Sequence, residues 1–108
     1  MDTISLAKDM LTAAAGAAKG HAKDLENYFE ARAKLIADGT AAIAADRLKK
    51  KITKKDAKFA FDEIRESERT TLVKAVEATS RAAAQDAINA ALAIAAKALS
   101  TATGIAIP

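Results

Sequence analysis

Few side chains in this sequence could do acid–base, nucleophilic or metal chemistry. His21 is the only histidine and there is no cysteine, which removes thiolate ligands and cysteine nucleophiles. Asp24 follows His21 by three residues, but a carboxylate-bridged metal bundle needs Glu-x-x-His pairs on two helices. The sequence also has neither a glycine-rich phosphate loop nor a nucleophile elbow. We therefore expect a protein that is not an enzyme and has no metal, cofactor or small-molecule substrate.

A basic run in the middle of the chain is the sharpest local feature. Residues 47–58 carry a charge of +6, although the whole chain carries only +3. Lysines act as point charges and read no bases, so we expect non-specific, salt-sensitive binding of a polyanion or of anionic lipid, and no sequence-specific nucleic-acid recognition. A solvated turn that keeps the protein soluble is the alternative interpretation. The candidate anion-binding residues are Arg47, Lys49, Lys50, Lys51, Lys54, Lys55 and Lys58.

Alanine dominates the segments that must position these residues. The chain has 108 residues and 51% hydrophobic side chains, but only 4% are aromatic. Alanine has the highest helix propensity, so the composition predicts an all-α fold with a single helical domain over residues 1–108. Because alanine buries little surface, we expect the chain to gain stability as a homo-oligomer.

The apolar pattern predicts two long helical arms that fold into an antiparallel hairpin. Apolar residues recur at steps of three or four over 3–51, with a kink at Gly39, where Thr40 would restart the helix as an N-cap. Gly16 and Gly20 are interpreted as points of close helix approach. The second arm spans 54–102, and each arm would be ~73 Å long.

Capping signals place the turn between the arms near residues 52–54. Thr53 is a suitable N-cap, with Asp56 at the third helical position, and Gly104 ends the second arm. In the alternative topology residues 40–66 form one helix, the chain breaks at Ser67, and the product is a compact three-helix bundle.

The last helix is small-sided on more than one face, which is typical of a helix surrounded by protein. Residues 87–107 contain one charge, Lys97, and we interpret them as a buried oligomer helix because a central lysine is costly in a membrane. The apolar tail residues Ile105 and Ile107 are expected to dock, on a neighbouring copy in preference to their own helix. The predicted oligomer interface comprises Leu11, Ala14, Ala18, Phe29, Val76, Ala87, Ala91 and Ile94.

Two functions of different classes remain open at this point. The first is a structural or interaction protein that self-assembles, as in a virion, filament or secretion-type component. The alternative is a peripheral amphipathic-helix binder of anionic lipid or of a granule surface through residues 47–58, and in composition the chain resembles the phasin type of protein. The N-terminus shows no cleavable signal peptide, so a cytoplasmic location, or assembly from the cytoplasm without such a signal, is expected.

Overall fold

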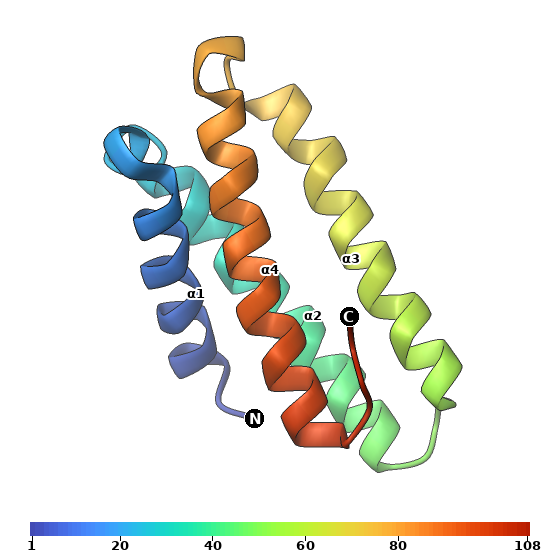
Figure 1. Cartoon of the computed structure of the whole chain (residues 1–108). Coiled ribbons are helices and arrows are strands. Elements are labelled where there is room, and N and C mark those ends of the chain that lie inside the picture. The colour runs from blue at the N-terminus through green and yellow to red at the C-terminus, as the bar shows by residue number, and fades with distance from the viewer.

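The computed structural model describes residues 1–108 and is built of four helices without strands. The two turns α1–α2 and α3–α4 lie at one end of the bundle, and the α2–α3 turn lies at the other (Figure 1). Short 3₁₀ helices occupy Lys19–His21 and Ala78–Ser80. The all-α prediction is confirmed. The helices are α1 (Thr3–Ala18), α2 (Glu26–Leu48), α3 (Lys54–Ala75) and α4 (Arg81–Thr103).

The chain has two more turns than the predicted hairpin, and its longest dimension is 43 Å. The first arm breaks at residues 19–25, where Lys19 adopts a φ of 54°. The second arm breaks at 76–80, where the Arg81 guanidinium donates to the carbonyl oxygens of Val73 and Val76. α3 continues through Ser67, so the three-helix alternative is wrong as well. Each break lets an arm fold back and bury its apolar stripe inside the same chain.

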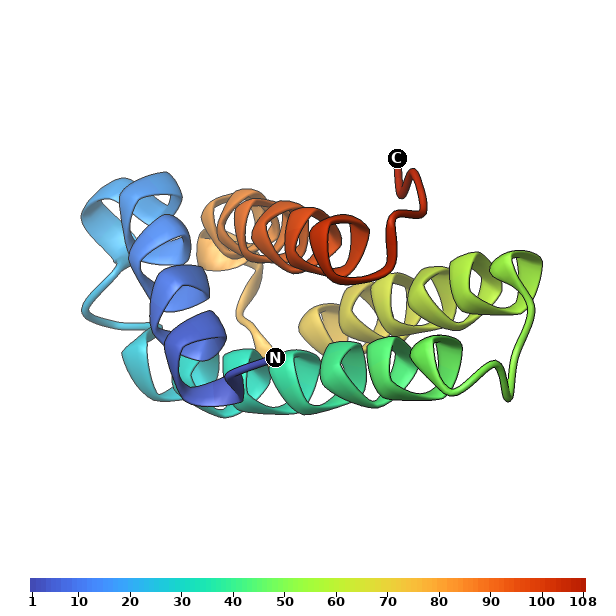
Figure 2. The ribbon, with the colours of Figure 1, turned by 90° about the horizontal axis from the view of Figure 1, so that it is seen from below.

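α4 lies between α1 and α3, and α2 lies across from it (Figure 2). The most extensive contact joins α1 to α4, while α3 makes smaller contacts with α2 and α4. Twenty-four buried apolar residues form one core. Its largest fully buried apolar side chains are Phe61, Met10, Ile36, Leu72, Ile88 and Leu99.

Three helix ends follow local capping chemistry. Asp2 caps α1 by accepting from the N–H groups of Ile4 and Ser5. The predicted turn before α3 is confirmed, because the Asp56 N–H donates to Thr53 Oγ1 at 3.0 Å and the Thr53 N–H donates to Asp56 Oδ2 at 3.1 Å. These hydrogen bonds lower the pKa of the Asp56 carboxyl. Gly104, with a φ of 73°, ends α4 as expected.

The predicted roles of the other glycines are wrong. Gly39 lies inside α2, and a Cβ there would stand 3.1 Å from Ile64 Cδ1, so this glycine marks a close approach of α2 and α3. Thr40 is buried, and its hydroxyl donates to the Ile36 carbonyl oxygen at 2.7 Å instead of capping a new helix. A Cβ on Gly16 or Gly20 would meet nothing within 4 Å. Neither residue therefore brings two helices together.

Candidate functional site

The α2–α3 turn and its flanks, residues 47–59, form what we call the basic tip. Lys50 adopts a left-handed φ of 58°. The N–H groups of Lys49 and Lys51 donate to the carbonyl oxygens of Ala45 and Asp46 at 3.0 and 2.9 Å. Ile52 is half-buried and packs against the core. The turn is therefore held by its own backbone and by one apolar anchor.

Arg47 differs from the other predicted anion-binding residues. Its side chain is half-buried, and Nη1 donates to the Ile52 carbonyl oxygen at 3.1 Å. Arg47 thus ties the end of α2 to the turn, and part of its hydrogen-bonding capacity is already used. The cations of the basic tip that face solvent are lysines.

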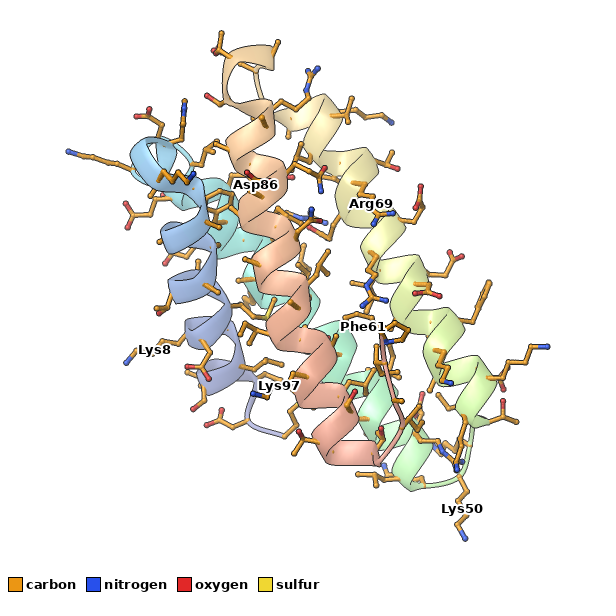
Figure 3. All side chains as sticks on the ribbon, viewed as in Figure 1. Lys8, Lys50, Phe61, Arg69, Asp86 and Lys97 are labelled. Carbon is orange, nitrogen blue, oxygen red and sulfur yellow. The ribbon has the colours of Figure 1, made fainter.

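Six lysines of the basic tip are exposed and free of ion pairs. The chain has three ion pairs, which join Arg32 to Glu68, Arg65 to Asp62 and Arg69 to Glu66, and none involves a lysine. The Lys50 side chain projects outward from the end of the bundle (Figure 3). Two of the lysines stand in the first turn of α3, at the positive end of its dipole. The six residues are Lys49, Lys50, Lys51, Lys54, Lys55 and Lys58.

Two large apolar side chains lie exposed among these lysines. Leu48 is 63% exposed and Phe59 is 65% exposed. From helical spacing alone Leu48 is expected to face inward and Phe59 to pack, but neither side chain belongs to the core or packs against it. Spacing does put Phe59 on a different face of α3 from Ala57 and Phe61, but only the structure shows that theirs is the face that meets the core. The basic tip therefore combines positive charge with apolar surface at one end of the molecule.

The predicted oligomer face is mostly used inside the chain. Leu11 and Ile94 are half-buried and pack against the core. The face joins α1, α2 and α4 of one molecule, because the extra turns bring these helices together. The remaining residues of the face are all buried, namely Ala14, Ala18, Phe29, Val76, Ala87 and Ala91.

The C-terminal tail packs on its own chain, between α4 and α3 (Figure 1). Ile105 is 3% exposed, and Ile107 is half-buried with its N–H donating to Ser100 Oγ at 3.1 Å. The Arg65 guanidinium donates to the carbonyl oxygen of Pro108. This arrangement differs from the expected docking on a neighbouring copy, because α3 and α4 leave room for the tail beside their own side chains.

A buried polar group joins α2 to α3. Arg32 Nε donates to Glu68 Oε1 at 2.8 Å, and the Glu68 side chain is 4% exposed. The Tyr28 hydroxyl is buried without a hydrogen-bond partner. Burial, and secondly the charge of Glu68, raise the pKa of Tyr28 above its ordinary value. This group lies within the bundle and holds two helices together.

The residues considered for catalysis and metal binding are dispersed or weakly connected. His21 Nδ1 lies 3.4 Å from Ser80 Oγ, a contact that joins the two turns at the end opposite the basic tip. No three histidine, cysteine or acidic side chains are grouped closely enough to hold a metal ion.

None of the helices combines the length and apolar character needed to cross a membrane. Comparison with family models, curated proteins and solved structures finds no match to this chain.

Proposed function

We propose that this protein attaches peripherally to an anionic lipid surface through the basic tip. The observation that carries the proposal is the exposure, at one end of the bundle, of six unpaired lysines together with Leu48 and Phe59. The lysines would lie among anionic headgroups, and the two apolar side chains would enter the boundary between headgroups and acyl chains.

Both components are needed for useful affinity. A lysine near an anionic membrane contributes ~1 kcal/mol. A leucine or phenylalanine side chain removed from water contributes ~1.5–3 kcal/mol. One weak interaction alone gives marginal, reversible membrane binding, whereas charge attraction and apolar insertion together give a stable anchor. The basic tip supplies both interactions from one turn and its flanking helices, whose backbone is already hydrogen-bonded, so little backbone ordering is required on binding.

The exposed apolar pair favours lipid over a polyanion such as RNA. Lysines alone would satisfy a phosphate-bearing polymer, and Leu48 and Phe59 would then stay in water. Burial of a side chain that is about two-thirds exposed requires an apolar layer beyond the charges. A lipid headgroup region has this layer.

Charge is tested first, by co-sedimentation with vesicles that contain an anionic phospholipid or only a neutral one. Changing Lys54 and Lys55 to Gln is expected to lower anionic-vesicle partitioning about 30-fold, at ~1 kcal/mol for each lysine. Changing Lys19 and Lys74 to Gln removes the same charge from exposed positions outside the basic tip. This control should retain nearly all binding. Equal losses in the two variants would show that net charge, and not the basic tip, governs attachment.

Insertion is tested by Phe59→Ser, with Val73→Ser as its control on the same helix. Both side chains are more than half exposed, so neither change removes core packing. Phe59→Ser should weaken vesicle binding about tenfold or more, and Val73→Ser should not. Binding that is indifferent to Phe59, and equally strong on a polyanion such as heparin, would assign the basic tip to polyanions instead. Absence of binding to anionic vesicles would overturn the proposal.

A further inference from the structure

A groove runs along the outer face of α1 and α2, remote from the basic tip. Two adjoining hollows of about 320 and 360 Å³ form it, and both are lined by Leu11 and Glu30. Ala7 and Ala15 lie on either side of Leu11 along the floor. Ile4 stands at one end of the groove and is 81% exposed, more than any other large apolar side chain. We infer that this groove is the contact face of a two-fold dimer of this chain.

The shape of the groove is self-complementary about Leu11. A two-fold axis that lies in the contact plane, at the level of Leu11 and perpendicular to α1, packs α1 antiparallel to the partner's α1. Ala7 then faces the partner's Ala15, and two alanines in register let the helices approach closely. Ile4 lies seven residues from the axis and reaches the hollow at the other end of the partner's groove. A protruding side chain thus meets a hollow twice in each dimer.

The charges on the rim favour the same antiparallel arrangement. Glu30 shares both hollows with Leu11, so it also lies at the axis. Lys34, four residues after Glu30, then faces the partner's Glu26, which lies four residues before the partner's Glu30. Asp38 likewise faces the partner's Lys23. A parallel arrangement would place α1 over the partner's α2 and bring Lys8 against the partner's Lys34, which is repulsive.

The size of the face and its balanced charge support a second copy as the occupant. The rim carries three lysines and three acidic residues, so it attracts neither an anionic nor a cationic ligand as a whole. A 16-residue helix is ~24 Å long, and two helices side by side are ~20 Å wide. The buried area is therefore ~500 Å² for each copy, close to the lower limit of specific interfaces. We expect a weak dimer that forms at micromolar concentrations.

The dimer has a consequence that rests on the proposed function. Lys50 lies twenty residues after Glu30, so each basic tip stands ~30 Å from the axis along α2. The antiparallel arrangement puts the two basic tips at opposite ends of the dimer, ~60 Å apart. Such a dimer would bridge two anionic vesicles, whereas a monomer would only coat one.

Sedimentation velocity over a hundredfold concentration range tests the dimer on the full chain. The wild-type protein should shift from monomer to dimer as the concentration rises. Ile4→Glu should stay monomeric throughout, and Val73→Glu, an equal change at an exposed site outside the groove, should dimerise normally. Circular dichroism would show that both variants keep the fold. A monomeric wild type, or a dimer unaffected by Ile4→Glu, would overturn the inference.

Charge reversal tests the register, and vesicles separate the two proposals. Lys34→Glu and Glu26→Lys should each weaken the dimer about tenfold, and the double variant should restore it. Failure of that rescue would overturn the antiparallel register. With anionic vesicles, Ile4→Glu should bind without clustering them. The Lys54 and Lys55 double variant should bind about 30-fold more weakly, cluster vesicles only at correspondingly higher concentration, and still dimerise. Vesicle clustering by a monomeric Ile4→Glu protein would contradict the bridging dimer without touching the proposed attachment.

Discussion

The contact between α1 and α4 and the contact between α2 and α3 are built in opposite ways. The first joins the two helices whose buried residues are mostly small, since seven of the twelve residues that α1 and α4 bury are alanines, among them Ala14 and Ala91. The second includes the Arg32–Glu68 pair, and α3 buries the large side chains Phe61 and Leu72 with only one alanine. The two contacts therefore distribute their stabilising energy differently along the helices.

A helix–helix contact made mostly of small side chains gains its energy from close approach of the two backbones over a long surface. No single alanine contributes much, but every one of them must stay small and uncharged for the helices to meet. A contact of large and charged side chains concentrates its energy at a few positions and leaves the rest of the helix free to vary. α3 uses this freedom, because most of its surface is charged and its first turns carry the basic tip.

The largest effect is expected from a charge in the small-sided contact. Ala91 is 2% exposed, so Ala91→Asp would bury an unpaired carboxylate with no room for it. We expect a loss of at least ~4 kcal/mol in the free energy of unfolding, enough to abolish a cooperative transition. Ala93→Asp, on the exposed side of α4, should melt within a few degrees of the wild type. Thermal denaturation followed by circular dichroism compares the two variants.

The same pair of variants addresses the predicted oligomer face. If Ala91 served only contacts between copies, Ala91→Asp would dissociate an assembly and leave a folded monomer. The burial of Ala91 within one chain predicts an unfolded protein instead. A folded, monomeric Ala91→Asp protein would contradict the burial of Ala91 within one chain.

A smaller effect is expected from breaking the ion pair between α2 and α3. Glu68→Ala leaves the Arg32 guanidinium, whose side chain is 19% exposed, without its carboxylate. Because Arg32 can still reach water, we expect a loss of ~2–3 kcal/mol, at or below the range for fully buried pairs. Glu66→Ala removes an exposed carboxylate from the same helix and should change stability by less than ~0.5 kcal/mol. Urea denaturation measures both values, and equal losses would show that the buried pair has no special role.

The only tyrosine of the chain reports on the same pair spectroscopically. Burial, and secondly the negative charge of Glu68, raise the pKa of Tyr28 above its ordinary value of 10.0. Glu68→Gln should therefore lower the midpoint of the phenolate absorbance titration. Since the folded-state pKa of Tyr28 is raised, its contribution to stability is complete below pH 10.0 and is lost as the pH rises through the folded-state pKa. An unchanged midpoint in Glu68→Gln would separate Tyr28 from the pair.

Features set by local chemistry were predictable, and those set by tertiary partners were not. The helical class, the turn near residues 52–54 with its Thr53–Asp56 cap, and Gly104 all follow from signals within a few residues. The breaks at 19–25 and 76–80 have weaker signals, and alanine faces look alike whether their partner is the same chain or another. Exposure of Leu48 and Phe59 follows from which face meets the core, which helical spacing alone leaves open. The lysines of the basic tip could be identified from the sequence, but the exposure of Leu48 and Phe59 beside them could not.

The smallest expected effect compares two glycines, one on α1 and one on α2. Gly16 lies in α1, and a Cβ there would meet nothing, so Gly16→Ala should stabilise the protein by up to ~1 kcal/mol through helix propensity. Gly39→Ala gains the same propensity, but its Cβ would press on Ile64 Cδ1 at 3.1 Å. Ile64 must move by a few tenths of an ångström, so the net gain should fall below ~0.5 kcal/mol.

Gly39→Leu sharpens this comparison, because its bulk would force α2 and α3 apart while Gly16→Leu stays tolerated. Urea denaturation ranks the four variants by their free energies of unfolding. An order in which Gly39→Leu is as stable as Gly16→Leu would mean that α3 is not held closely against α2. In that case the Arg32–Glu68 pair would be the main link that positions the helix bearing three of the six lysines and Phe59 of the basic tip.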